Sequence, residues 1–353
     1  GGVPAVVLAE RHLQEFDSVR KFLGFAACLA CASVGPAAAG QAGTSGKPPI
    51  DYSILHAQVI LDHLGFAPGI LDGREGQSLT AALKGFQAAR GMPVTGKLDP
   101  ATLHALAPYA SLRPVRRLTL DAATLEGPYV NPIPRDIEKQ ARLPALAYTR
   151  PLEKLAEMFH TTPQMLVELN PGGGRIRPGA EFVFPNALPA SRDYPADLKP
   201  EWRRTLAMLN VEAKVPEADH IVVDKSEKVL KVFDRQEHLV AQFSATMGSA
   251  HDPLPIGTWK INGADTNPKF HYNPKLFWDA KKGSDPAMLP PGPNGPVGVV
   301  WLDLSKEHYG IHGTPEPQLI GRTESHGCIR LTNWDAARLA LMVKPGTKAV
   351  FRE

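Results

Sequence analysis

A short segment near the end of the chain combines a cysteine, two histidines and several glycines. Between Tyr309 and Leu331 it reads YGIHGTPEPQLIGRTESHGCIRL, and His312 lies sixteen positions before Cys328. A thiol reacts as a thiolate, so it needs a base or a positive charge nearby that lowers its pKa. The imidazoles can supply the base, and glycines let backbone N–H groups approach a reacting carbonyl. The segment therefore predicts a nucleophilic cysteine, although a single cysteine or histidine is more often only a buried structural residue.

The letters HGT and SHGCIRL within this segment resemble the active-site signature of the bacterial cell-wall L,D-transpeptidases, with their YkuD/ErfK-like catalytic domain. The resemblance extends over about residues 219–352 and includes DPLPIGTWKI at residues 252–261. From His220 onward apolar residues alternate with polar ones, which is typical of strands. Strands are expected at 221–223, 228–233, 239–246, 297–302 and 348–351, and a helix capped by Thr332 and Asp335 at about 334–343.

The resemblance implies a role for each residue of the signature. Cys328 is expected to be the nucleophile, and His312 the general base, a role that suits an imidazole pKa near neutrality. The carbonyl of Gly313 is expected to orient the His312 ring, where other triads use Asp or Asn. His326, Gly327 and the backbone N–H of Cys328 are expected to stabilise the oxyanion.

Four further residues are expected to bind substrate: Arg330, Ser325, Tyr309 and Trp278. The planar, permanently charged guanidinium of Arg330 suits a substrate carboxylate. Alternatively Arg330 forms a structural salt bridge, His326 a structural hydrogen bond, and Ser325 only shapes the loop. An aromatic loop from Phe270 to Trp278 and a Pro/Gly stretch at 290–296 are expected to cover the substrate groove, although such aromatics are more often core.

The expected reaction starts from the tetrapeptide stem of peptidoglycan. The enzyme would form a thioester at Cys328, release D-alanine and transfer the acyl group to an amine of another stem. Related possibilities are an L,D-carboxypeptidase, which gives the thioester to water, and an enzyme that couples a protein to the wall. A non-catalytic wall-binding scaffold is an alternative of another class, but intact Cys328 and His312 argue against it.

No cofactor or metal is expected. His312, His326 and Cys328 could together ligate zinc as in a zinc peptidase, but no HExxH or comparable spacing supports such a site. The formal charge of +3, from 39 basic and 36 acidic residues, is too small and dispersed to indicate nucleic-acid binding. The resemblance to the L,D-transpeptidases implies that the partners are the stem peptides and glycan of peptidoglycan.

Residues 1–40 are expected to form an export signal that directs the protein to the periplasm or cell envelope. A basic pair at 20–21 precedes an apolar run from Phe22 to Val34, and small residues allow cleavage near Ala39. The run is about half of what a membrane-spanning helix needs, so no permanent span is expected. Residues 1–19 are consistent with a mis-assigned start.

Cleavage near Ala39 would remove two of the three cysteines, Cys28 and Cys31. Cys328 would then be the single thiol in an oxidising compartment, which favours reactivity over a structural role. Lipidation at Cys28 or Cys31 is an alternative, but the apolar stretch before Cys28 is very short.

Residues 50–108 predict a small three-helix domain. Apolar residues recur at helical spacing from about Tyr52, a second helix is expected at 77–90, and Asp99 with Pro100 opens a third. The strings LGFAPGILDG, KGFQAARG and TGKLDPAT resemble the peptidoglycan-binding domain. The alternative is an unrelated helical bundle that acts as a spacer.

The remaining segments complete an α+β multidomain fold. Residues 109–145 are expected to be a Pro-rich connector with one possible strand at 117–120. Residues 146–186 resemble a LysM-like βααβ module in LxxLAxxF, LxxLNP and IxPG, but depart from it at Tyr148–Pro151. Residues 187–218 are expected to form a linker and a helix, and 219–353 the β-rich L,D-transpeptidase domain.

Overall fold

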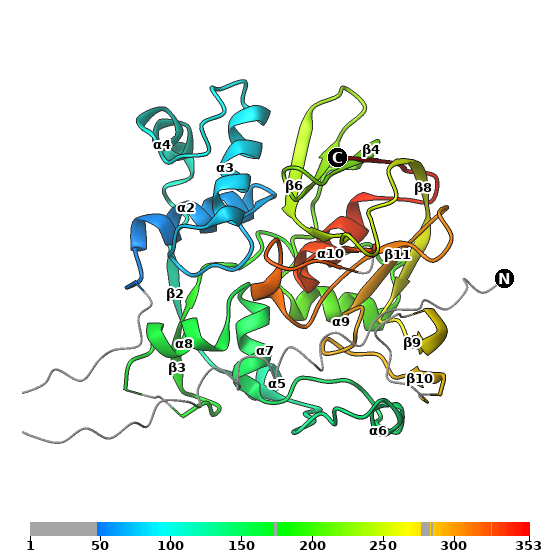
Figure 1. Cartoon of the computed structure of the whole chain (residues 1–353). Helices are drawn as coiled ribbons and strands as arrows, with labels where there is room; N and C mark the ends of the chain where they lie inside the picture. The colour runs from blue at the N-terminus through cyan, green and yellow to red at the C-terminus, as the bar shows by residue number, and fades with distance from the viewer. Residues whose placement is uncertain (1–47, 173–174, 277–282, 284, 326) are drawn as a thin grey trace, which may run out of the picture.

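A computed structural model describes residues 48–172, 175–276, 283, 285–325 and 327–353 (Figure 1). It has a helical part at the N-terminal end, a smaller βααβ part, and a β-rich part that ends the chain. The expected α+β class with a helical domain and a β-rich domain is confirmed. The proposed export signal, with Cys28 and Cys31, lies outside the described residues. None of the helices in the described ranges combines the length and apolar character that a membrane crossing requires.

The helical part contains α2 (Tyr52–His63), α3 (Gln77–Ala89) and α4 (Pro100–Leu106), followed by the short helix η1 (Ala107–Tyr109). The side chain of Asp51 caps α2, and Asp99 accepts a hydrogen bond from the N–H of Thr102 at 2.9 Å. These bonds satisfy N–H groups that the first helical turn leaves without partners. Leu61, Leu83 and Phe86 lie in the core between the helices.

This helical part is joined to the β-rich part through their backbones. Strand β1 (Phe66–Ala67) pairs in parallel with β6 (Leu239–Ser244), so the helical part adds an edge strand to the large sheet. The side chain of Gln242 on β6 donates to the carbonyl of Ala81 at 2.6 Å and lies against Gly85. Because backbone and side-chain bonds cross this boundary, the two parts form a continuous packed structure.

The second part has the order strand, helix, helix, strand: β2 (Val115–Thr119), α7 (Pro151–Met158), α8 (Pro163–Leu169) and β3 (Glu181–Pro185). Strands β2 and β3 pair antiparallel, with Val115 opposite Pro185. The first strand therefore comes from the stretch expected to be a connector. Its partner lies more than sixty positions away along the chain, so local sequence patterns do not reveal the pairing.

The rest of the expected connector also has structure, because it contains α5 (Ala122–Leu125) and α6 (Ile137–Ala141). Helix α6 contacts the hairpin of β9 (Phe270–Tyr272) and β10 (Ala287–Leu289) at the lower right of Figure 1. Leu146 follows and exchanges backbone hydrogen bonds with the Pro/Gly stretch, to Pro291 at 2.9 Å and from Asn294 at 3.0 Å. The segment is thus bound to the β-rich part rather than free.

The β-rich part is built on a mixed sheet with the order β1-β6-β5-β4-β14-β8-β11-β12-β13-β7. The strands not yet given are β4 (His220–Asp224), β5 (Val229–Phe233), β7 (Thr246–Met247), β8 (Gly257–Thr266), β11 (Val300–Leu304), β12 (Gly310–His312), β13 (Ile329–Arg330) and β14 (Lys348–Arg352). Helices α9 (Pro200–Met208) and α10 (Asn333–Met342) supply apolar residues to the same core as the sheet. The short helices η2 (Pro274–Leu276) and η3 (Pro317–Leu319) lie in its loops.

The strand expected at 297–302 begins at Val300 instead. Gly298 adopts a φ of +60°, and its N–H bonds to the carbonyl of Gly295 at 2.9 Å, so the backbone turns there. A Cβ on Gly298 would also come within 1.9 Å of Asn333 Oδ1. A glycine is therefore required where the apolar pattern alone predicts a strand.

A buried polar cluster joins all three parts. His160, at the end of α7, contacts Asp62 of α2 through Nδ1 and the carbonyl of Leu209 through Nε2, both at 2.8 Å. Arg338 of α10 donates to the carbonyl oxygen of Asp62 at 3.0 Å and to its Oδ1 at 3.3 Å. Burial opposes ionisation of Asp62, but His160 and Arg338 hold its pKa well below its usual range.

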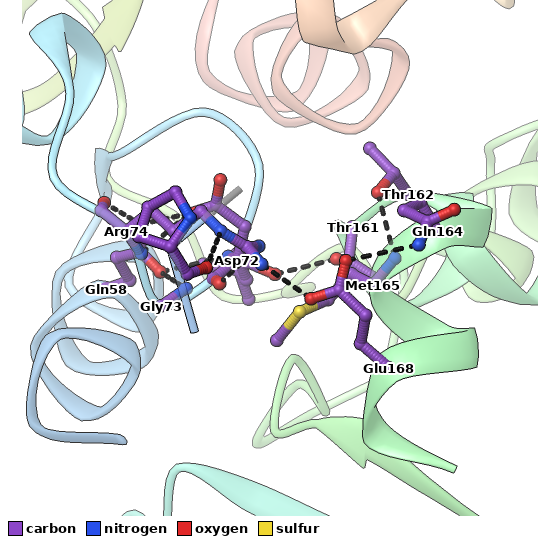
Figure 2. A network of polar contacts seen from close by, with 11 residues as sticks. Gln58, Asp72, Gly73, Arg74, Thr161, Thr162, Gln164, Met165 and Glu168 are labelled. Carbon is purple, nitrogen blue, oxygen red and sulfur yellow. Dashed lines mark hydrogen bonds and ion pairs between the residues drawn. The ribbon is translucent and has the colours of Figure 1, made fainter. Parts of the chain in front are cut away.

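A second network joins the helical part to α8 (Figure 2). Arg74, in the loop after α2, donates to Glu168 of α8 at 2.5 Å. Gln58 holds this loop by accepting from the N–H groups of Asp72 at 3.0 Å and Gly73 at 2.8 Å. The helical part is therefore bound to the βααβ part by polar contacts, in addition to its strand pairing with the large sheet.

Candidate active site

The sheet brings the two ends of the signature together. Strand β12, which ends at His312, pairs in parallel with β13, which begins directly after Cys328. His312 lies opposite Arg330 in this pairing, and Ile311 opposite Ile329. The fifteen residues between His312 and Cys328 therefore form the connection from β12 to its neighbour β13.

Cys328 is almost completely buried, with 1% of its surface exposed. It belongs to an apolar cluster with Phe270, Tyr272 and Trp301, and Leu146, the first residue of the expected LysM-like module, belongs to the same cluster. Burial raises the pKa of the thiol to about 12, and a backbone hydrogen bond from Gly310 and the charge of Arg330 offset this only in part. At pH 7 this raised pKa favours the neutral thiol, so a nucleophilic role for Cys328 requires a group that removes its proton.

His312 is equally buried, and its Nδ1 lies 2.7 Å from the carbonyl oxygen of Gly313. A carbonyl oxygen only accepts hydrogen bonds, so Nδ1 must carry the proton and Nε2 is the basic nitrogen. The ring also stacks on Trp301, with 5.5 Å between centroids. The geometry of His312 and Gly313 is thus the one that a general base with an orienting carbonyl needs.

The loop before Cys328 is shaped by a glycine and a serine. Gly327 has a φ of +93°, and a Cβ there would approach Cε1 of Tyr309 to 2.6 Å. The Ser325 hydroxyl donates to the carbonyl of Cys328 at 2.5 Å, and the Ser325 N–H bonds to the carbonyl of Gly248. Tyr309 therefore lies against the loop, while the buried Ser325 holds its backbone.

Arg330 lies on β13 between the two neighbouring strands, opposite His312 on one side and Thr246 on the other. Only 9% of its surface is exposed, and its charge acts on Cys328. Two of the expected site residues, His326 and Trp278, lie outside the described residues. The other expected site residues lie on or next to the paired strands β12 and β13: Cys328, His312, Gly313, Gly327, Ser325, Tyr309 and Arg330.

A group of residues that could ligate a metal ion lies elsewhere in the fold. Within the described ranges, Asp219, His220 and Glu237 form the single group of at least three His, Cys, Asp or Glu residues whose ligand atoms come within 4.8 Å of one another. His220 begins β4, which three strands separate from β12 in the sheet order. This group includes neither Cys328 nor His312.

Several residues that shape the site were not expected from the sequence. Asn333 begins α10 and lies against Gly313, and Glu157 of α7 hydrogen-bonds to it. Trp301 of β11 stacks on His312. Asn333 follows the signature closely in the chain, but no local pattern distinguishes it from a helix cap.

Two segments of the chain match known protein families. Residues 218–351 match the family described as the L,D-transpeptidase catalytic domain, and residues 52–106 match the one described as "Putative peptidoglycan binding domain". The "Putative L,D-transpeptidase YkuD" of Bacillus licheniformis is 30% identical over 200 residues, which cover 56% of this chain and 90% of that relative. The chain belongs to the L,D-transpeptidase family.

Other relatives share a smaller part of their length. The "Probable L,D-transpeptidase YbiS" of Escherichia coli K12 is 26% identical over 210 residues, 58% of this chain and 60% of that protein. Among solved structures, "L,D-transpeptidase from Mycobacterium smegmatis" aligns with a TM-score of 0.32 and 19% identity over 38% of this chain and 58% of that chain. Family membership identifies this L,D-transpeptidase as an acyltransferase, and a cysteine nucleophile is typical of the family.

Proposed function

We propose that this L,D-transpeptidase acts on the tetrapeptide stem of peptidoglycan and transfers its acyl group to an amine of another stem. The observation that carries the proposal is the pairing of β12 with β13. This pairing places the neutral, buried thiol of Cys328 beside the strand that holds His312 in its Nε2-basic form. Wall-binding modules upstream of such a site are consistent with an insoluble wall substrate.

The chemistry proceeds in two acyl transfers. The Cys328 thiol passes its proton to Nε2 of His312 as the sulfur attacks the carbonyl of the diamino acid, and the carbon–nitrogen bond to D-alanine breaks. His312 returns the proton to the leaving amine, which leaves a thioester on Cys328. An acceptor amine then attacks the thioester while His312 takes its proton, and the thiol is regenerated with that proton.

We assign the remaining residues by their positions. The backbone N–H groups of Gly327 and Cys328, with His326, are proposed to face the oxyanion. Arg330 is the proposed partner of a substrate carboxylate, with Ser325, Tyr309 and Trp278 around it. No step requires a cofactor or a metal.

The surroundings of Cys328 favour transfer over hydrolysis. Phe270, Tyr272 and Leu289 of the hairpin, with Leu146, enclose the thiol in an apolar cluster. An apolar enclosure limits the access of water to the thioester, so an amine bound in the groove competes better. The L,D-carboxypeptidase and the protein-coupling enzyme remain the alternatives that use the same thioester.

Mass spectrometry of the products tests this proposal. The full chain with purified stem tetrapeptide should yield released D-alanine and cross-linked dimers, whose amount increases with acceptor concentration. Tripeptide alone at every acceptor concentration would identify a carboxypeptidase. Unchanged tetrapeptide, from a chain whose circular dichroism shows a folded protein, would contradict the assigned substrate.

The helical domain and the βααβ part are proposed to bind the wall, the second as a LysM-like glycan-binding module. The LysM-like assignment is supported by the strand–helix–helix–strand order of the βααβ part and by the pairing of β2 with β3. A pocket at this junction is lined by residues of both parts, among them Asp72, Arg74, Thr162 and Gln164. These four residues are labelled in Figure 2. Polar side chains of this kind can hydrogen-bond a glycan. Export to the cell envelope is proposed because the substrate is there.

Sedimentation with insoluble peptidoglycan should show this binding. We expect the full-length Cys328→Ala variant to sediment with the wall. This variant cannot turn over the stem peptides, so turnover does not release it from the wall. Gln164→Ala and Thr162→Ala together should weaken binding because they remove pocket-lining polar groups, whereas His238→Gln on an exposed turn should not. Sedimentation no greater than that of an unrelated protein of equal charge would contradict wall binding.

A further inference from the structure

Glu157 of α7 reaches from the βααβ part to Asn333, the first residue of α10. Nδ2 of Asn333 donates to Oε1 of Glu157 at 2.8 Å and to the carbonyl of Pro293 at 3.1 Å. On the other side of the amide, Oδ1 of Asn333 accepts from the N–H of Val299 at 3.2 Å. Asn333 is fully buried and Glu157 is 7% exposed. The amide is therefore held from both ends in a dry environment, where such bonds are strong.

Asn333 in turn lies directly against the peptide that orients the catalytic base. A Cβ on Gly313 would come within 2.1 Å of Asn333 Oδ1, so this side chain leaves no space there. The carbonyl of the same Gly313 accepts from Nδ1 of His312 at 2.7 Å. Interiors are close-packed, so a shift of the Asn333 amide would also shift the Gly313 peptide and the His312 ring.

We propose that Glu157 is a positioning residue for the catalytic base. Through Asn333 it fixes the Gly313 carbonyl, and through that carbonyl it fixes the orientation and tautomer of His312. The inference rests on the general-base function proposed above for His312. It makes the docked βααβ part a component of the active site, because a residue of α7 completes the chain of contacts.

The competing explanation is that Glu157 only attaches the βααβ part to the catalytic domain. Tyr148 offers a matched control, since its hydroxyl donates to Glu157 Oε2, the oxygen that does not contact Asn333. Tyr148→Phe removes one buried hydrogen bond of Glu157 but leaves the contact with Asn333. Burial raises the pKa of Glu157 to about 7, so measurements at about pH 8.5 compare the variants with an ionised carboxylate.

The test uses the full-length chain with Glu157→Ala, Glu157→Gln, Glu157→Asp and Tyr148→Phe. Glu157→Ala should lower kcat by about tenfold to a hundredfold with KM changed less than about twofold, because only the base is displaced. Glu157→Gln keeps an oxygen that can accept from Asn333 and should restore most of kcat. Glu157→Asp shortens the side chain and should lower kcat as much as Glu157→Ala. It still tests the proposal if the alanine variant does not fold. Tyr148→Phe should keep kcat near the wild-type value.

A second readout is independent of the stem substrate. The rate at which iodoacetamide alkylates Cys328, followed by mass spectrometry of its peptide, depends on proton transfer to His312. Its pH profile should shift in Glu157→Ala and Glu157→Asp, but not in Tyr148→Phe. Two results would overturn the positioning role. One is an equal loss of kcat in all variants together with unshifted alkylation profiles, and the other is a kcat of Glu157→Gln as low as that of Glu157→Ala. A wild-type chain that leaves the stem peptide intact would contradict the proposed function, while the alkylation profiles would still test Glu157.

Discussion

Replacing Cys328 with alanine should abolish turnover of the stem tetrapeptide. Every covalent step of the proposed reaction passes through the sulfur, and no other cysteine lies in the part of the chain that the structure describes. The substitution removes one atom from an apolar cluster, so the fold should persist with a small loss of stability. Released D-alanine and cross-linked dimers, measured by mass spectrometry, should both fall to the background without enzyme.

The control for this variant is Cys328→Ser, which retains the shape of the side chain but replaces the thiol with a less nucleophilic hydroxyl. It should also be inactive, and both variants should melt cooperatively. Turnover within about tenfold of wild type in Cys328→Ala would exclude the nucleophile assignment, since nucleophile losses are far larger. A chelator should leave the wild-type enzyme active, whereas a zinc peptidase would lose its activated water.

The residues of the proposed reaction occupy one continuous segment. Cys328, His312 and Gly313 lie within a motif of fewer than twenty-five residues, and its resemblance to the L,D-transpeptidase signature is what suggests their roles. The strands that hold them were not foreseen. With three residues in β12 and two in β13, they are too short to display the alternation that identifies a strand.

The contacts around these residues depend on distant parts of the chain. Glu157 lies 176 positions before Asn333, and Leu146 reaches the Cys328 cluster from the start of the expected LysM-like module. Neither residue is unusual in its local sequence. Their roles follow from the way the βααβ part docks on the β-rich part. Residue patterns within one segment cannot predict such contacts between segments.

The close packing of the three parts also could not be predicted from the sequence. Asp62, His160 and Arg338 come from three segments that were expected to be separate modules joined by linkers. Each residue alone would be expected at the surface, because charged side chains are rarely buried unless paired. Their mutual pairing makes burial possible, and it gives the helical and βααβ parts a fixed position relative to Cys328.

Replacing His312 with glutamine should slow acylation of Cys328 by about a hundredfold to ten-thousandfold at neutral pH, the range that general-base catalysis contributes. The physical reason is the thiol itself. Its pKa is raised to about 12 by burial, so very little thiolate exists at pH 7 unless a base takes the proton during attack. Stopped-flow measurement of acylation with the stem tetrapeptide gives this rate directly. His238→Gln, which removes an exposed imidazole from another turn, should acylate at the wild-type rate.

The pH dependence of the His312→Gln variant provides a sharper test. Without the base only preformed thiolate reacts, and its fraction increases about tenfold for each pH unit below the thiol pKa. Acylation by the variant should therefore accelerate steadily with pH. The wild-type rate should depend less on pH, since Nε2 of His312 takes the proton during the attack. The deficit should consequently shrink as the pH rises. Unchanged acylation in His312→Gln at neutral pH would instead transfer the base role to His326, and a deficit constant across the pH range would show that the thiolate is already formed in the resting enzyme.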